Sequence, residues 1–291
     1  MPPIRGRRGA RDPEDSDEES TQGGGRSSDA EEGGDLRAPS SVDVMVKKLV
    51  RLALACEYSR QPIRRTDINA KVFGEQGTRQ FRTVFDRAQQ ELRALFGMQM
   101  VELPAKEKVT IRERRAAQRV EKPSTTAKSW ILCSTLPSEY RSPAILPPNR
   151  APSTFTEASY TALYTFIISL ITLCGGSISE QKLERYLQRT NAETYTPVDR
   201  TDRLLQRMCK EGYLVRTRET EGGEEMVEYM VGPRGKIEVG EAGVAGLVRT
   251  VYGRNKSAEG DEGADEEADI FERKLERSLA HSRRFNVASE D

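Results

Sequence analysis

The pattern of apolar and polar positions predicts a helix ahead of the chain's midpoint, from Val42 to Tyr58. Its apolar residues recur three and four positions apart, which is the spacing of one helix face. Ser41 is the expected N-cap, and Gln61-Pro62 ends the helix because proline cannot continue it. The apolar positions are Val42, Met45, Val46, Leu49, Leu52, Ala53 and Cys56.

Two further helices and a strand are expected next. A short extended piece lies around Ile63, and Thr66 is the expected cap of a second helix. A third helix runs from Thr78 to Phe96, and Gly97 follows it as the left-handed residue that ends many helices. Residues 98–103 are expected to form a strand. The side chains expected to face inward are Ile68 and Val72 in the second helix and Phe81, Phe85, Ala88, Leu92 and Leu95 in the third.

The same order of elements returns further along the chain. Residues 159–173 form a helix that is apolar nearly all round, and Gly175-Gly176 ends it. Ile178 lies in a short extended piece, and a second helix carries Leu183 and Leu187. Thr196-Pro197 is the expected cap and first residue of a third helix, which Gly212 ends. Two strands, 213–218 and 226–231, flank a turn at 221–223.

Equal spacings connect the two halves. Ile63 to Gly97 spans 34 residues, as does Ile178 to Gly212. Helix, short strand, helix, helix and hairpin is the winged-helix order, a variant of helix-turn-helix. We therefore predict a mainly α-helical fold with small β wings, built from tandem winged helices over 41–137 and 154–254. Residues 138–153, rich in proline, are expected to form a stiff, extended linker.

Charge is distributed unevenly along a chain whose formal net charge is zero. Residues 41–254 carry a net charge of +9, whereas 1–40 and 255–291 are acidic. Both ends have few residues to bury and are expected to be disordered. An amphipathic helix is expected within 270–285, with Leu275 and Leu279 on one side; because it would be marginal alone, we expect it to fold on a partner.

Residues with catalytic chemistry are scarce. The four cysteines form no C-x-x-C pair, and three lie in apolar, helical stretches, which favours reduced thiols in an intracellular protein. The single histidine, His281, lies in the acidic tail, and neither a metal-ligand cluster nor a phosphate-binding loop is present. The N-terminal residues lack a secretory signal, and the apolar run 158–174 is too short for a comfortable membrane span. We expect no enzyme activity, cofactor, metal, small-molecule substrate or membrane contact.

Several short stretches resemble the MAGE homology domain over about residues 42–252. In the first half they are the leucine-rich helix, which here has Leu52-Ala53-Leu54 where the family has paired leucines, and the segments that follow it. Gly232-Pro233-Arg234, after the second wing strand, is the most specific signal. The others are Gln61-Pro62-Ile63, Phe81 and Phe85, Leu95-Phe96-Gly97, Lys128 to Pro137, and Glu211-Gly212-Tyr213-Leu214.

The resemblance implies a fold and a set of partners. The family has tandem winged helices, of which the first binds a RING-type ubiquitin-ligase subunit and the second a kleisin subunit. A basic MAGE chain with acidic tails resembles the single-copy member of the family, which belongs to the structural maintenance of chromosomes complex of the five–six type and contacts duplex DNA. The resemblance thus implies a nuclear, chromatin-bound DNA-repair scaffold that stimulates its RING partner. It assigns no residues to the kleisin contact.

The third helix of the second half carries the sharpest candidate site. Four cations at intervals of three, four and three share one narrow helix face, opposite Leu204 and Met208. Cations bind phosphate by releasing counterions, so this face favours duplex DNA without strong sequence preference. The alternative is a solvated face partly offset by Asp199 and Asp202. The candidate DNA-binding residues are Arg200, Arg203, Arg207 and Lys210, with Arg216 and Arg218 on the adjacent strand.

Two other surfaces are open to more than one interpretation. The basic run 106–128 is either a charged loop or a second DNA contact. The first helix has an apolar arc too wide for one core stripe, which indicates either packing within the chain or a partner. The candidate RING-partner residues are Leu49, Val50, Leu52 and Leu54. A winged-helix transcription regulator that binds specific DNA sites is the alternative function.

Overall fold

The computed structural model describes residues 40–74, 78–104, 128–142, 144–147, 152–221, 224–253 and 268–280. Most of both acidic ends, the turn at 222–223 and His281 lie outside these ranges. The basic run 106–128 also lies outside them except for Lys128, whose ammonium is 2.8 Å from a carboxylate oxygen of Glu102. The expectations for those segments therefore remain predictions.

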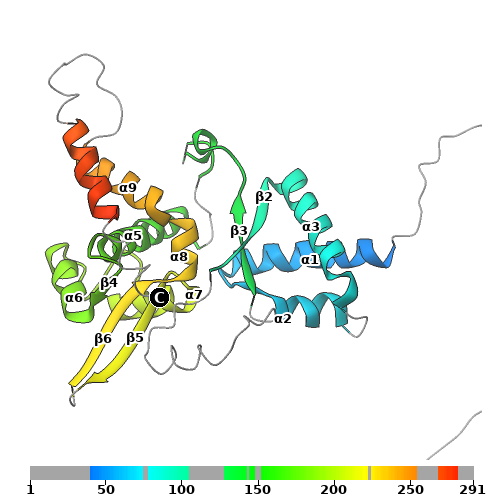
Figure 1. Cartoon of the computed structure of the whole chain (residues 1–291), viewed down its shortest axis with the longest axis horizontal. Helices are drawn as coiled ribbons and strands as arrows, with labels where there is room; N and C mark the ends of the chain where they lie inside the picture. Colours follow the sequence, from blue (N-terminus) through cyan, green and yellow to red (C-terminus); the bar gives the residue numbers. More distant parts are fainter. Residues whose placement is uncertain are drawn as a thin grey trace, which may run out of the picture. The chain divides into compact units, whose positions relative to one another are not determined.

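The first half packs helices on one side of a small antiparallel sheet (Figure 1). Its strands lie in the order β1-β3-β2, and helix α1 packs against α3. Short π-helical and 3-10 segments, 69–73 and 78–80, lie between α2 and α3. The elements are α1 (Ser41–Tyr58), β1 (Ile63–Arg64), α2 (Arg65–Ile68), α3 (Phe81–Phe96), β2 (Met98–Glu102) and β3 (Ser129–Ser134).

The second half repeats this plan and adds two helices at its end. Its strands lie in the order β4-β6-β5, with β5 and β6 paired as a long hairpin. The added helices, α8 and α9, follow the hairpin, and α9 packs against α5. The elements are α5 (Thr154–Leu173), β4 (Ser177–Ser179), α6 (Glu180–Arg189), α7 (Thr201–Glu211), β5 (Leu214–Glu221), β6 (Glu224–Val231), α8 (Pro233–Glu238) and α9 (Gly240–Val251).

Equivalent hydrogen bonds confirm that the two halves are copies of one fold. After α1, the amide of Gln61 donates to the carbonyl of Cys56 at 2.8 Å. After α5, the amide of Gly176 donates to the carbonyl of Ile171 at 3.0 Å. Gly176 lies 115 positions after Gln61, and Ile171 lies 115 positions after Cys56. The same offset separates Ile63 from Ile178. The predicted tandem winged-helix fold is confirmed.

Each half has its own hydrophobic core. In the first, α1 and α3 bury Leu49 and Leu92 against Trp130 of β3. In the second, Tyr160 and Ile167 of α5 are fully buried with residues of α6, α7 and α9. A helix over 268–280 joins this second core through Leu275 and Leu279, so it packs on its own chain rather than awaiting a partner. Two separate cores agree with the division into 41–137 and 154–254, whose boundaries remain a prediction.

The start of the linker, residues 138–141, is less extended than its prolines indicate. Residues Ser138–Arg141 form a 3-10 turn. The guanidinium of Arg141 closes this turn by donating to the carbonyls of Leu136 at 2.6 Å and Ser134 at 3.1 Å. These two bonds satisfy carbonyl groups that would need another partner if the segment were extended. They therefore favour the turn over an extended chain.

The predicted starts of α1, α2 and α7 were wrong because the capping residue was misassigned, and α5, capped by Ser153, begins five residues before its predicted start at 159. Ser40, not Ser41, caps α1: its hydroxyl accepts from the amide of Asp43, whose carboxylate in turn accepts from the amide of Ser40. Thr66 lies inside α2, which begins one residue earlier. Thr196 caps a turn that ends at Asp199, and α7 begins five residues after Thr196.

The prediction for the inner face of α3 was partly wrong. Leu95 is 72% exposed, while Val84, which the pattern left out, is fully buried with Ala88 and Leu92. Phe81 and Phe85 are half-buried at the edge of the core, where the Phe85 ring lies 5.1 Å from that of Trp130. The buried stripe therefore runs through 84, 88 and 92. It is offset by one position along the helix from the line through Phe81 and Phe85.

The structure also shows the environment of the four cysteines and of the most apolar helix. All four cysteines are free and half-buried. Among the described residues, no helix is both long enough and apolar enough to cross a membrane. Helix α5, the most apolar segment, instead buries its tyrosines and isoleucines within the second half.

Leu92 and Leu95 provide a matched test of the α3 register. Leu92→Ala should lower the free energy of unfolding by about 2–5 kcal/mol, because it removes a fully buried side chain. Leu95→Ala, in the same helix, should change it by less than about 0.5 kcal/mol, since Leu95 is exposed. Urea unfolding followed by circular dichroism measures both, and equal losses would contradict the register.

Candidate nucleic-acid and partner surfaces

Helix α7 is held in place by one buried face. Leu204 and Met208 enter the second core, and the buried hydroxyl of Thr201 donates to the carbonyl of Ala192 at 2.7 Å. Gly212 ends the helix in the left-handed conformation, with φ of 87°. These contacts fix the rotation of α7 and therefore determine where its four predicted cations lie.

Three of these cations face solvent. Arg203 is 68% exposed, and its guanidinium approaches Asp199 only to 4.0 Å. Arg200, the residue before the helix, is half-exposed and lies 3.6 Å from Asp202. Lys210 is exposed and forms no ion pair within the part of the chain that the structure describes. Arg200, Arg203 and Lys210 are therefore accessible to a polyanion, although two of them have a nearby carboxylate.

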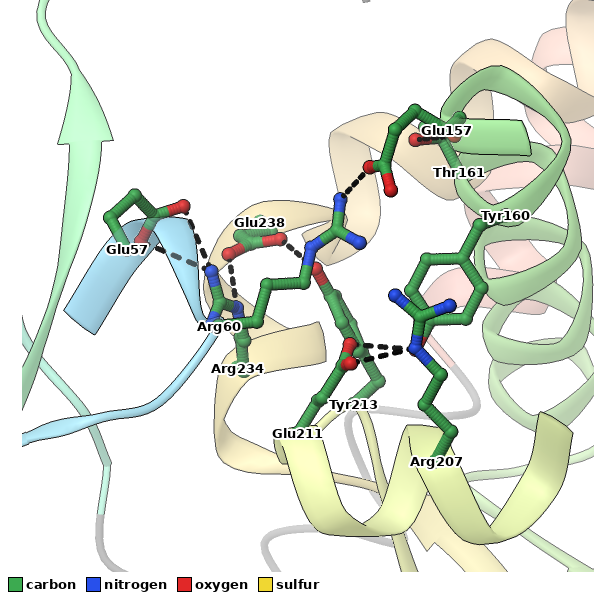
Figure 2. Close-up of polar contacts among 10 residues, drawn as sticks. All are labelled: Glu57, Arg60, Glu157, Tyr160, Thr161, Arg207, Glu211, Tyr213, Arg234 and Glu238. Carbon is green, nitrogen blue, oxygen red and sulfur yellow. Dashed lines mark hydrogen bonds and ion pairs between the residues drawn. The ribbon is translucent and has the colours of Figure 1, made fainter. Parts of the chain in front are cut away.

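Arg207, the fourth cation, is occupied within the protein. Its guanidinium carbon lies 4.0 Å from the centre of the Tyr160 ring, and its Nε donates to Glu211 at 2.8 Å. The hydroxyl of Tyr160 donates to the other oxygen of the same carboxylate at 2.8 Å. Figure 2 shows this closed group of three side chains between α5 and α7. Arg207 thus differs from its neighbours in having a structural partner on each side.

The two wing arginines also have carboxylate partners. Arg216 of β5 pairs with Glu180 at 2.9 Å, and the hydroxyl of Tyr229 donates to the same Glu180 oxygen at 3.2 Å. This contact ties the hairpin to the first residue of α6. Arg218 pairs across the hairpin with Glu225 at 3.2 Å, and both side chains are more than half exposed. Arg216 therefore has a structural role in holding the hairpin, whereas Arg218 lies on the surface.

A second row of cations was missed by the sequence reasoning. Lys182, Arg185 and Arg189 lie on α6 at intervals of three and four, on the face opposite the buried Leu183 and Leu187. All three are exposed, and none forms an ion pair among the described residues. The signal was available, because the spacing is the same as that used for α7.

The apolar arc of α1 divides into core and flank. Leu49 is fully buried and Val50 is 7% exposed, and both fill the first core, which is the packing alternative for these two residues. Leu52 and Leu54 are half-buried at its edge. At 100° per residue these two leucines lie about 160° apart, on opposite flanks of the buried stripe. The wide arc therefore consists of a core face with one exposed edge on each side.

Charged side chains connect the end of α1 to the second half (Figure 2). The guanidinium of Arg60 donates to Glu157 of α5 at 2.7 Å. Arg234 of α8, only 2% exposed, donates to both oxygens of Glu57 at 3.0 and 3.1 Å and to Glu238 of its own helix. The hydroxyl of Tyr213 donates to the other Glu238 oxygen at 2.7 Å. We call Glu57, Arg60, Glu157, Arg234 and Glu238 the junction cluster.

The electrostatics of the junction follow from burial. Burial raises the pKa of Glu57, and the nearby Arg234 opposes that rise. Burial alone would lower the pKa of the Arg234 guanidinium, but Glu238 and Glu57 outweigh it and the pKa rises. Burial, together with the same two carboxylates, raises the pKa of Cys133 on β3 to about 11. The Cys133 thiol is therefore neutral at physiological pH and unreactive.

A cleft of about 550 Å³ opens beside the junction cluster. Its lining mixes apolar and charged side chains from both halves. Within the described residues, no group of histidine, cysteine, aspartate or glutamate side chains has the arrangement of a metal site. The lining residues are Leu54, Glu57, Tyr58, Ser59, Arg60, Met98, Pro152, Glu157, Arg207 and Glu211.

Comparison with known proteins identifies the family. The family model of the MAGE homology domain matches residues 49–242. The chain belongs to the MAGE family. A relative from Schizosaccharomyces pombe (strain 972), the non-structural maintenance of chromosome element 3, is 28% identical over 216 residues, which cover 72% of this chain and 64% of the relative. This MAGE chain thus matches a little under two thirds of that relative's length.

A solved structure supports the fold of the MAGE domain. A chain of the Nse1-Nse3-Nse4 complex superimposes with a TM-score of 0.59 and 17% sequence identity. The match covers 86% of this chain and 100% of the other. At this level of identity the likeness concerns the fold.

The most specific MAGE signal, Gly232-Pro233-Arg234, has a steric and an electrostatic reason. A Cβ at Gly232 would lie 2.3 Å from the carbonyl oxygen of Gly212, so only glycine fits where the end of β6 passes the end of α7. Pro233 starts α8 at a position where its missing amide hydrogen costs nothing. Arg234 then enters the junction cluster. The three residues of the motif therefore end a wing strand, start α8 and supply the buried charge of the junction cluster.

Arg60 has an unusual backbone conformation for a residue other than glycine. It follows α1 in the left-handed conformation, with φ of 51°, where glycine is preferred. The corresponding residue after α5 is Gly175, with φ of 98°. Because an arginine in this conformation is disfavoured, its contact with Glu157 and its position 5.0 Å from the Tyr160 ring centre offset the strain.

Arg234→Met tests whether the junction depends on its buried cation. At pH 7 we expect a loss of about 3–5 kcal/mol in the free energy of unfolding, because Glu57 and Glu238 lose their buried partner. Without the cation that opposes it, the pKa of Glu57, which burial already raises, should rise further above its unfolded value, so the variant should lose stability as the pH rises through that range. The deficit should therefore be smaller at pH 4.5 than at pH 7.

Arg218→Met is the matched control, because Arg218 pairs with Glu225 on the exposed hairpin surface. Its loss should stay below about 1 kcal/mol at both pH values. Urea titrations at the two pH values measure both variants. Equal deficits for the two would show that the junction does not depend on Arg234.

Proposed function

We propose that this MAGE protein is a non-catalytic scaffold subunit of a structural maintenance of chromosomes complex of the five–six type. In this role it binds a RING ubiquitin-ligase subunit, a kleisin subunit and duplex DNA, and it acts in DNA repair in the nucleus, on chromatin. Support comes from the relative, whose name describes a non-structural maintenance of chromosome element, and from the fold shared with a chain of the Nse1-Nse3-Nse4 complex. The family assignment carries the proposal.

The proposed DNA surface comprises the solvent-facing cations of α6 and α7. In a helix-turn-helix pair, one helix lies in or along the groove while the other crosses the phosphate backbone. Both helices here bury an apolar face and expose cations. We assign phosphate contact to Arg200, which caps α7, to Arg203 and Lys210 of α7, and to Lys182, Arg185 and Arg189 of α6, with Arg218 on the wing.

Arg207 and Arg216 have a supporting role in this proposal. Arg207 stacks on Tyr160 and pairs with Glu211, while Arg216 ties the wing to Glu180. Contact with phosphate would compete with these bonds. Both side chains therefore position α7 and the hairpin, and the accessible cations bind.

Weak, sequence-independent binding follows from the same geometry. Helix α7 has one amide side chain, Gln206, whereas adenine recognition usually uses an amide placed for two hydrogen bonds. Asp199 and Asp202 lie beside Arg203 and Arg200 and offset part of their charge. The DNA affinity is therefore dominated by counterion release and depends steeply on salt.

The partner surfaces are assigned to different halves. We place the RING subunit on the Leu52 flank of α1, because the Leu54 flank borders the cleft beside the junction cluster. We place the kleisin on the second half, as the family implies, without assigning contact residues. Mixing the purified chain with both subunits should give one three-chain complex by size exclusion with light scattering, and failure to assemble would contradict the scaffold.

Charge reversal tests the DNA surface. Arg203→Glu combined with Lys210→Glu should weaken binding to a 30-base-pair duplex more than about tenfold at 100 mM salt. The slope of log affinity against log salt should fall by about 2, since each lost phosphate contact contributes about 0.9. Fluorescence anisotropy with duplexes of unrelated sequence measures both quantities.

Arg273→Glu combined with Lys274→Glu is the matched control, because it reverses one arginine and one lysine on the exposed side of the helix over 268–280, which packs on the same half. This variant should bind within about twofold of the wild type. An equal loss in both double variants would remove α7 from the site. A strong preference for one duplex sequence would favour a transcription regulator instead.

Leu52→Asp tests the RING-partner surface. It should weaken capture of the RING subunit at least about tenfold, because it places a charge on the proposed contact edge. Leu54→Asp is the matched control on the opposite flank and should retain capture. Bio-layer interferometry measures binding, and circular dichroism checks that each variant is folded. Unchanged capture by folded Leu52→Asp would contradict the assignment.

A further inference from the structure

The two halves of the chain meet through charged side chains rather than through a shared core. The described apolar residues fall into two buried clusters, one in each half, with no member in common. Every pair of described helices or strands that packs closely likewise lies within one half. In the sequence, residues 138–153 connect the halves. The junction cluster therefore lies where little apolar packing joins them.

The contacts of the junction cluster interlock, as Figure 2 shows. Arg60 of the first half reaches Glu157 of the second at 2.7 Å and lies 5.0 Å from the centre of the Tyr160 ring. In the opposite direction, Arg234 of the second half donates to both oxygens of Glu57 at the end of α1. Each half thus supplies one cation and one carboxylate to the other.

The closed junction is finely balanced. The side chain of Arg234 is 2% exposed and that of Glu157 is 9% exposed, so both charges have little contact with water. For buried ion pairs this loss of hydration offsets most of the attraction, and removing one partner disfavours burial of the other strongly. The cleft of about 550 Å³ beside the cluster shows that the two surfaces fit less tightly than a protein interior. Closure therefore depends on charges from both halves.

We propose that the junction cluster is an ionic latch. It holds the two halves in the closed arrangement, and they separate as folded units when its charges are removed or screened. Each half keeps its own core in the open arrangement, because neither core takes a residue from the other half. The latch thereby sets where the exposed cations of α7 lie relative to the first half. It is a property of the chain alone, independent of the DNA and subunit contacts proposed above.

Opening the latch in the full-length chain tests the proposal. Glu57→Ala combined with Arg60→Gly removes the two latch charges of the first half. Glycine suits position 60, where φ is 51°, so the end of α1 should keep its shape. Single-molecule energy transfer between dyes on azidophenylalanine in place of the exposed Gln90 of α3 and Gln188 of α6 measures the separation. The wild type should show one population, and more than about half of the variant molecules should show a second, with a different transfer efficiency.

Glu225→Ala combined with Arg218→Met is the matched control, because it removes the same two kinds of charge from an ion pair within the second half. It should keep the wild-type population. Fluorescence of Trp130, the single tryptophan, reports on the first core, and near-ultraviolet circular dichroism of the buried tyrosines reports on the second. Both signals should remain native in the latch variant. Intact cores together with an unchanged population in that variant would overturn the proposal.

A salt titration of the labelled wild type avoids substituting any latch residue, in case the latch variant fails to fold. At 1 M sodium chloride the screening length is about 3 Å, comparable with the ion-pair distances of the latch. Ions can reach Glu57, Arg60 and Glu157, because all three line the cleft. The second population should therefore grow between about 0.1 and 1 M salt while both cores stay intact. A single, unchanged population throughout would show that packing holds the halves together, and there would be no ionic latch.

Discussion

The buried guanidinium of Arg234 is the constraint on which the arrangement of this MAGE domain depends. It is 2% exposed and takes its carboxylate partners from different places: Glu57 ends the first helix of one half, and Glu238 lies in α8 of the other. An arginine this deep is tolerated because both carboxylates compensate for the loss of water. The contact therefore couples the folding of residues separated by 177 positions. Gly232, which admits no side chain, is what lets the chain reach this place.

The structure distinguishes two kinds of arginine that look alike in the sequence: those paired inside the protein and those accessible to solvent. Arg60, Arg207 and Arg234 each lie against a tyrosine ring and bond a carboxylate, so their charges are used inside the protein. Arg203 lies in the same helix as Arg207 and has only a distant carboxylate. Net charge counts these residues equally, although only accessible cations can release counterions from DNA. The proposed interface is consequently smaller than the charge of the central region indicates.

Much of the fold could be predicted from local signals. Helical spacing located α1, α3 and α5, and the glycines at 97 and 212 marked two helix ends because both need the left-handed conformation. Register was harder: the pattern correctly placed Ala88 in the core, but it favoured Phe81, Phe85 and Leu95 over the fully buried Val84. The start of α7 was missed because Thr196 caps a turn rather than the helix. Local capping patterns do not distinguish these two outcomes.

The candidate site was less predictable, since its character depends on partners distant in sequence. Spacing placed Arg207 with Arg203 and Lys210, but it contained no information about Tyr160, which lies 47 positions earlier. Leu49 and Leu52 appeared equivalent for the same reason. In the structure Leu49 is buried in the first core, whereas Leu52 is half-buried at its edge. The missed row on α6 is different, because its spacing was visible and needed no tertiary information. Periodicity therefore finds candidate faces, whereas burial and pairing determine which residues on them are accessible.

The carboxylates beside the proposed DNA surface fit the proposed scaffold better than a free-standing reader. Asp199 and Asp202 stand at the start of α7, where a helix N-terminus would otherwise favour a phosphate group. A protein that had to hold DNA alone would gain affinity by losing these carboxylates. A subunit tethered to other DNA contacts needs less, because a modest local affinity acts at high effective concentration once the complex is on the duplex. In the proposed scaffold, the acidic residues would limit binding by the isolated chain, so that DNA would be held mainly by the assembled complex.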